Sequence, residues 1–114
     1  QIKDAVIDTW EGEPDISLEL LQKVFVGTPH IAGYSADGKA NATRMSLEAL
    51  CQYFGKSAEF VIVPLALPEK IYSENPEEAY LEVYNPMEDS LRLKENPEKF
   101  EWFRGNYPLR RELF

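Results

Sequence analysis

The sequence predicts an α+β chain in three parts: the last strand–helix–strand unit of a doubly wound sheet, a long crossover helix and a small α+β domain. Two short apolar runs with an amphipathic segment between them indicate the first part. A continuous helical pattern indicates the second, and a change to a proline- and aromatic-rich composition after Gly55 indicates the third. We therefore divide the chain into residues 1–34, 35–55 and 56–114.

The first part contains two expected strands. Residues 5–7 are a short apolar run that ends at the polar Asp8, which is typical of a buried parallel strand. An amphipathic helix is expected from its cap at Ser17 to Val24, and residues 25–26 indicate the second strand. Functional residues of such sheets gather at the carboxyl ends of the strands, so the loops that follow both strands are of interest.

The second part is one helix. Its apolar residues fall on neighbouring faces from Ser35 onward, small residues near its start would allow close packing, and Gly55 is a natural stop.

The third part is expected to contain one strand, at residues 60–63, and three short helices. Each helix follows a proline, a residue that suits the first helical position, and the three are expected at residues 77–84, 87–94 and 98–103. Large rings near the end should lie in a core or an interface: Trp102, Phe103, Tyr107 and Phe114.

Composition excludes several classes of function. Lys and Arg number 12 against 20 Asp and Glu, and the net charge of −8 argues against nucleic-acid binding, which needs clustered cations. No apolar run approaches the length of a membrane span, and no secretory leader is evident, so we expect a soluble, cytoplasmic protein. The single cysteine excludes an internal disulfide, and no metal site is expected.

Two polar residues of the chain could form a pair that transfers a proton. Glu13 and His30 lie in successive strand-end loops, where the fold can bring them together. A carboxylate beside an imidazole fixes its tautomer and favours its charged form, so the ring can give a proton to a carbonyl oxygen or take one from a hydroxyl. Taken singly, each residue also has an ordinary structural interpretation: a histidine after a proline, a solvated loop glutamate, or, for Asp8, a turn residue.

The two loops together resemble a known family. Asp8–Pro14, with the sequence DTWEGEP, and Gly27–Tyr34, with the sequence GTPHIAGY, are similar to the closing signature of the D-2-hydroxyacid dehydrogenases, apart from Thr9, where valine is usual. The resemblance implies an NAD-binding (Rossmann) domain in residues 1–34. It also implies that His30 is the proton donor and acceptor and that Glu13 is its carboxylate partner. Asp8 would contact the nicotinamide end of NAD, and Gly33 would lie against the cofactor.

Three features resemble the branch of this family that acts on erythronate 4-phosphate: the residue sequence of both loops, the long segment after Gly55 and the ending at residues 103–112. That resemblance implies oxidation of 4-phospho-D-erythronate at its 2-hydroxyl, a step of pyridoxal phosphate biosynthesis. It also implies a substrate contact at Tyr34 and homodimerisation through residues 56–114.

Two elements of such an enzyme are absent from the sequence. The glycines form no G-x-G-x-x-G turn for a pyrophosphate, and no arginine precedes Glu13 to hold a substrate carboxylate. With Gln1 in place of a start methionine, we expect a C-terminal fragment, inactive alone. Arg104, Arg110 and Arg111 would bind a substrate phosphate or, more in keeping with an acidic protein, pair with its own carboxylates.

Two alternatives remain open. In the first, the longer protein belongs to the same family but acts on glycerate, hydroxypyruvate or 3-phosphoglycerate. In the second, the chain is a dimerisation module that carries the motif without catalysis.

Overall fold

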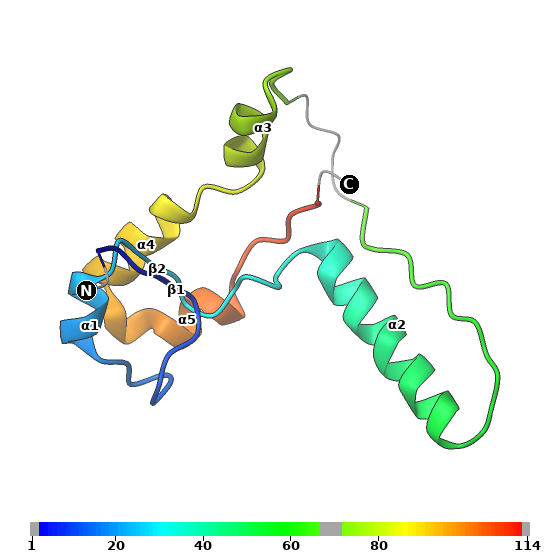
Figure 1. Ribbon diagram of the computed structural model, residues 1–114. Coiled ribbons are helices and arrows are strands. Elements are labelled where there is room, and N and C mark those ends of the chain that lie inside the picture. The colour runs from blue at the N-terminus through cyan, green and yellow to red at the C-terminus, as the bar shows by residue number, and fades with distance from the viewer. Residues whose placement is uncertain (1–2, 67–71, 113–114) are drawn as a thin grey trace.

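The computed structural model describes residues 3–66 and 72–112 (Figure 1). Strand β1 is Val6–Ile7, helix α1 is Leu18–Lys23 and strand β2 is Val26–Gly27. The two strands are parallel, with Val6 opposite Val26 and Ile7 opposite Gly27. The predicted strand–helix–strand unit is therefore confirmed, with the second strand one residue later than expected.

The predicted long helix is also confirmed. Helix α2 is Ala36–Tyr53, and the Ser35 hydroxyl caps it by accepting a hydrogen bond from the N–H of Gly38 at 2.8 Å. Gly55 follows with φ 62°, a left-handed conformation in which glycine is favoured, and the helix stops there. The helix projects away from the part of the chain that contains the two strands (Figure 1).

Three prolines begin the remaining helices, as expected. Helix α3 is Pro76–Val83, helix α4 is Pro86–Glu95, and a 3₁₀ turn at Pro97–Lys99 leads into helix α5, Phe100–Gly105. Asparagines at positions 75 and 85 cap α3 and α4 by accepting hydrogen bonds from the backbone two residues further on.

The strand predicted at residues 60–63 is wrong. The side chains of Val61 and Val63 are 88% and 77% exposed. The segment lies along the first turns of α2, and its described backbone is not paired with another strand. A strand needs a partner for its backbone groups, and the described residues provide none at this place. The β pairing described for the C-terminal part is one parallel bridge, between Ser35 and Arg110.

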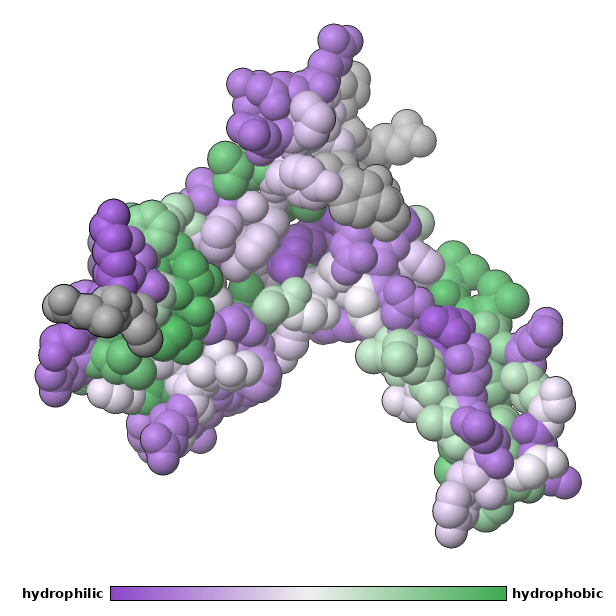
Figure 2. All heavy atoms as spheres, viewed as in Figure 1, coloured by the Kyte–Doolittle hydropathy of each residue, from purple (hydrophilic) through white to green (hydrophobic). Residues whose placement is uncertain are grey.

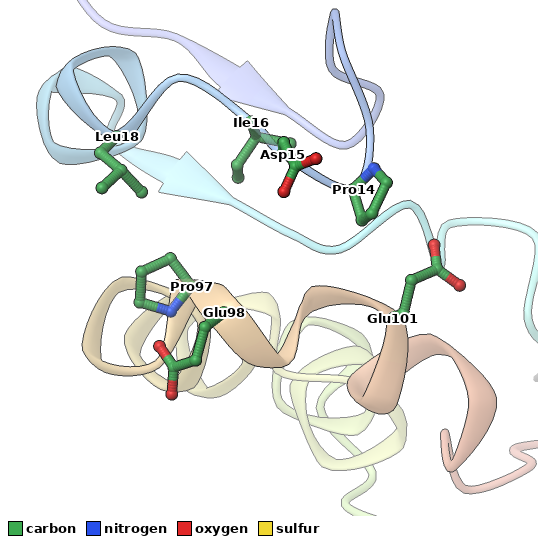
Figure 3. A pocket seen from close by; sticks show the side chains of 7 residues that line it. All are labelled: Pro14, Asp15, Ile16, Leu18, Pro97, Glu98 and Glu101. Carbon is green, nitrogen blue, oxygen red and sulfur yellow. The ribbon is translucent and has the colours of Figure 1, made fainter.

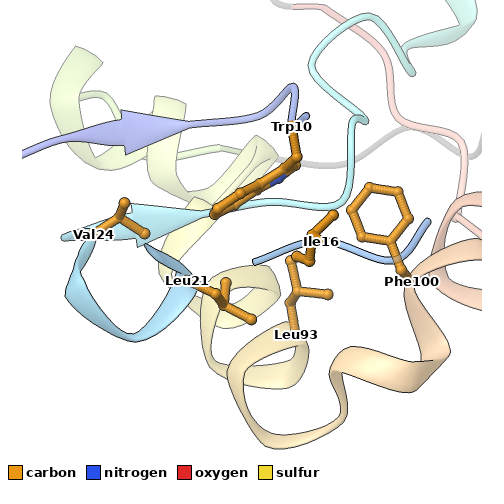
Figure 4. Close-up of a cluster of buried hydrophobic side chains, with 6 residues drawn as sticks. All are labelled: Trp10, Ile16, Leu21, Val24, Leu93 and Phe100. Atoms are coloured by element: carbon orange, nitrogen blue, oxygen red, sulfur yellow. The ribbon is translucent and has the colours of Figure 1, made fainter. Parts of the chain in front are cut away.

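One hydrophobic core joins the two ends of the chain (Figure 4). Trp10 lies over β2, and α4 and α5 close the core from the opposite side with Leu93 and Phe100, which are 0% and 1% exposed. The other buried members come from the first part: Ile16, Leu21 and Val24. Residues 86–105 therefore pack directly on the strand pair that carries the predicted site.

Helix α4 also bonds to the backbone beside β2. The hydroxyl of Ser90 accepts a hydrogen bond from the N–H of Gly27 at 3.0 Å, and Lys94 Nζ donates one to the carbonyl of Val24 at 2.7 Å. Gly27 has no room for a side chain, because an added Cβ would lie 2.9 Å from both the Leu21 methyl and the Trp10 ring.

The surface view shows apolar side chains both on the compact part and along the α2 arm (Figure 2). Around this arm, several large side chains are more than half exposed: Met45, Leu50, Tyr53, Phe54, Val61, Val63 and Leu65. Within residues 3–66 and 72–112, no helix has the length and hydropathy needed to cross a membrane.

Candidate functional site

The predicted site residues lie in the loops that follow the carboxyl ends of β1 and β2. Asp8 comes directly after β1, and Glu13 is further along the same loop. His30 to Tyr34 occupy the loop between β2 and α2. The parallel pairing of the two strands brings these loops to the same edge, as the sequence analysis expected.

Glu13 and His30 form the predicted pair. Glu13 Oε2 lies 2.8 Å from His30 Nδ1, and Glu13 Oε1 accepts a hydrogen bond from the backbone N–H of Trp10 at 2.7 Å. Burial acts to raise the pKa of Glu13, but the hydrogen bonds from His30 and Trp10, with the charge of Arg104, together lower it below the ordinary value. The carboxylate is therefore ionised at neutral pH.

An ionised Glu13 determines the tautomer of His30. A carboxylate only accepts hydrogen bonds, so His30 Nδ1 carries the proton and donates it to Glu13. The second ring nitrogen, Nε2, is then the atom that can take up or release a proton. The His30 side chain is 44% exposed against 19% for Glu13, so the ring remains accessible from outside while its partner is covered.

Asp8 holds the loop that carries His30. Its Oδ1 accepts hydrogen bonds from the Thr28 hydroxyl at 2.7 Å and from the N–H of Ile31 at 2.8 Å. Its Oδ2 accepts one from the N–H of Ala32 at 3.1 Å. His30 has φ 56°, a left-handed conformation that costs a residue with a side chain about 1–3 kcal/mol and persists only where the surroundings enforce it. The bonds to Asp8 supply part of that constraint.

Gly33 and Tyr34 follow in the same loop. Gly33 is exposed, and nothing lies within 4 Å of the position that a Cβ would take. The Tyr34 ring packs edge-on against Tyr107, with centroids 5.9 Å apart, and Lys39 Nζ lies 4.6 Å from its centroid. The predicted residues thus share one edge of the sheet, with Tyr34 on the side toward α2.

The three C-terminal arginines behave differently from one another. Arg104 Nη1 donates to Glu101 at 2.9 Å, and Arg111 binds both carboxylate oxygens of Asp37 at 2.8 Å. The Arg111 bonds, with a further bond from the backbone, lower the pKa of Asp37 to about 2. Within residues 3–66 and 72–112, Arg110 has no carboxylate at salt-bridge distance: it donates to the carbonyl of Ala32 and to a tyrosine hydroxyl. Pairing with the protein's own carboxylates is confirmed for two of the three.

A groove lies beside the loop after β1, lined by Pro14, Asp15, Ile16, Leu18, Pro97, Glu98 and Glu101 (Figure 3). Its charged side chains are all carboxylates, which would repel an anionic ligand. Among the residues that the structure describes, no three histidine, cysteine or acidic side chains gather as metal ligands would.

Three residues organise this site in roles that were not predicted from the sequence. Trp10 donates its backbone N–H to Glu13. Its indole N–H donates to the carbonyl of Thr28 at 2.8 Å. Thr28 binds Asp8, and Arg110 binds the loop from the far end of the chain. Trp10 and Thr28 stand inside the two recognised motifs, which was a usable signal. Nothing in the sequence near Arg110 points to a carbonyl 78 residues away.

No family model matches the chain. It is 62% identical over 112 residues to an erythronate-4-phosphate dehydrogenase of Bacteroides thetaiotaomicron, an alignment that covers 97% of this chain and 32% of the relative. It is 43% identical over 118 residues to the enzyme of that name from Porphyromonas gingivalis, covering 95% of this chain and 31% of the relative. The corresponding protein of Coxiella burnetii is 37% identical over 117 residues, with 94% and 32% covered.

The chain is therefore homologous to erythronate-4-phosphate dehydrogenases, which confirms the resemblance seen in its two loops. It spans about a third of the length of these relatives.

Proposed function

We propose that this chain is part of a longer NAD-dependent dehydrogenase that oxidises 4-phospho-D-erythronate at its 2-hydroxyl to the 2-oxo acid. The observation that carries the proposal is the hydrogen-bonded Glu13–His30 pair, in a chain that is 62% identical over 112 residues to an erythronate-4-phosphate dehydrogenase. The pair has the geometry of a general base oriented by a carboxylate.

The chain's own contribution is proton transfer. His30 Nε2 takes the proton of the substrate hydroxyl as the carbonyl forms, and Glu13 stabilises the imidazolium that results. The hydrogen bonds that Asp8 accepts from the loop, and the burial of Glu13, keep the ring in place before substrate arrives. NAD, when bound, supplies the acceptor for the hydrogen that leaves C2 with its electron pair.

The residues present fit the nicotinamide end of that cofactor. Asp8 Oδ2 accepts one hydrogen bond, from Ala32, so this oxygen can accept another from an amide N–H₂ group. Gly33 leaves open space where a side chain would stand. Asp8 and Gly33 are therefore our proposed cofactor contacts, and the pyrophosphate would be held by residues outside this chain, since its glycines form no G-x-G-x-x-G.

We assign Tyr34 to the substrate, because it lies four positions after His30, at the side of the loop where Lys39 adds a positive charge. A panel of 4-phosphoerythronate, glycerate and 3-phosphoglycerate, assayed with the longer protein, tests the substrate. A kcat/KM for either of the other two that equals or exceeds the value for 4-phosphoerythronate would replace our assignment with a different 2-hydroxy acid.

The 114-residue chain alone is expected to show no NAD-dependent oxidation of any of these acids, because it lacks a pyrophosphate turn and a carboxylate-binding arginine ahead of Glu13. NADH formation at 340 nm, measured for the chain and for the longer protein side by side, checks this. Turnover by the chain that disappears in a His30→Ala variant would contradict it.

We also propose that the protein is a homodimer that uses residues 56–114. The exposed valines at 61 and 63 support this proposal, since large apolar side chains at such exposure commonly mark an interface. A closed two-fold dimer is the commonest assembly of soluble proteins.

Replacing Val61 with glutamate in the longer protein is expected to weaken its self-association by at least about tenfold, since a buried unpaired charge costs several kcal/mol. Sedimentation equilibrium measures the effect. Leu18→Glu is the matched control, because Leu18 is also more than half exposed but lies on α1, in the first part of the chain. The proposed interface would be refuted if the unchanged longer protein were monomeric, or if both changes weakened its self-association equally.

A further inference from the structure

We propose that Arg110 is a positioning residue for the proton-transfer pair: its guanidinium holds the loop of His30 from the C-terminal end of the chain. The inference rests on the proposed function for its consequence in catalysis. Its structural basis, the contacts of Arg110, stands without that function.

Arg110 reaches the loop directly. Its Nη2 donates to the carbonyl of Ala32 at 3.2 Å, and its Nη1 donates to the hydroxyl of Tyr107 at 3.0 Å. The guanidinium carbon lies 4.2 Å from the centroid of the Tyr84 ring and 5.5 Å from that of Tyr107. A planar cation that stacks on rings and donates in two directions is held in one orientation.

Tyr107, which accepts a hydrogen bond from Arg110, is itself held in place. Tyr107 donates its hydroxyl hydrogen to Asp89 Oδ2 at 3.0 Å, and Asp89 is 14% exposed on helix α4. Burial raises the pKa of Tyr84 to about 12, so this ring is a neutral phenol throughout the physiological range. Since α4 packs on β2, the guanidinium is tied to the same body that carries the Glu13 loop.

The residue that Arg110 binds is the one that Asp8 also binds. Asp8 accepts the N–H of Ala32, and Arg110 donates to its carbonyl, so Ala32 is held on both its backbone groups. His30 stands two residues earlier with φ 56°. Without the hold on Ala32, the loop can relax toward an ordinary conformation and carry the imidazole away from Glu13.

Arg111 provides a matched control. It follows Arg110 in the same segment but donates both of its described side-chain hydrogen bonds to Asp37 on α2, away from the loop of His30. The backbone of the segment is attached to α2 independently of either side chain, since the carbonyl of Arg110 accepts the N–H of Ala36 at 2.8 Å. Arg110→Lys therefore keeps the charge and the backbone contact but removes the planar guanidinium, whose nitrogens donate in fixed directions while it stacks on the tyrosine rings.

In the longer protein, Arg110→Lys is expected to lower kcat at least about tenfold, because small displacements of a catalytic group reduce rates steeply, with less than about a threefold change in the KM for NAD. The pH at which kcat/KM is half-maximal should also move, as it would in Glu13→Gln. Arg111→Lys should leave both kcat and the pH profile unchanged. A wild-type profile in Arg110→Lys, or the same losses in Arg111→Lys, would overturn the proposal.

Hydrogen exchange separates this inference from the proposed function. In Arg110→Lys, the amides of Ile31 and Ala32 in the longer protein should exchange about five- to tenfold faster than in wild type, the loss expected for a loop released from one hydrogen bond. The amide of Leu93 in α4 should be unaffected. If the wild-type protein proves inactive but these rates rise, the function fails and the positioning role stands. Unchanged rates at Ile31 and Ala32 defeat the positioning role whatever the activity.

Discussion

Replacing His30 with alanine in the longer protein is expected to lower kcat by about 10²- to 10⁴-fold, the usual range for loss of general acid–base help, with little change in NAD affinity. Because Nδ1 of His30 is bonded to Glu13, Nε2 is the ring nitrogen left to exchange a proton, and the side chain that carries it is partly exposed. Steady-state kinetics with 4-phosphoerythronate, together with NAD binding by calorimetry, check both parts. A kcat within threefold of wild type would remove His30 from the mechanism.

The pH profile gives a second measurement of the same pair. The pKa of Glu13 is lowered, so its negative charge is present across the range in which an imidazole titrates, and this charge favours the imidazolium. Glu13→Gln removes the charge. The acid limb of kcat/KM for oxidation should then move to lower pH, because the mutant no longer has the carboxylate that stabilises a positive charge beside it. Glu11→Gln, an exposed change in the same loop, should leave the limb in place.

Phe100→Ala is expected to lower the free energy of unfolding by about 3–5 kcal/mol, the cost of removing a large ring from a packed core. Phe100 is 1% exposed and joins α5 to the core formed around Trp10 and Leu21. Chemical denaturation of the longer protein, followed by tryptophan fluorescence, measures the change.

Trp102→Ala is the control for that change. Trp102 lies on the same helix but is 60% exposed, so its replacement should cost much less, within about 1 kcal/mol. Equal losses in the two variants would show that the described packing of α5 on the strand pair is not the source of stability.

Local signals explain which elements the sequence predicts. Ser17 and Ser35 each cap a helix through their own hydroxyl, and the prolines at 76, 86 and 97 each begin a helical segment. Such features act over three or four residues, so they can be recognised without knowledge of the tertiary structure. The Glu13–His30 pair was predictable for another reason: parallel strands bring the loops at their carboxyl ends together.

Long-range packing explains what the sequence does not predict. Helix α1 contains three leucines, of which Leu21 is fully buried, whereas Leu18 and Leu20 are 57% and 43% exposed. The difference depends on where α4 and α5 lie, which no local signal gives. The strand predicted at residues 60–63 was wrong for a related reason, since a short apolar run cannot show whether a partner strand exists.

The side chains of α4 that bond beside β2 also determine how the sheet can extend. Ser90 binds the N–H of Gly27, a backbone group on the side of β2 away from β1, and Lys94 covers the carbonyl of Val24 just before it. An incoming strand would have to displace both bonds and the helix that provides them. This edge of β2 is therefore protected against edge-to-edge pairing with another molecule.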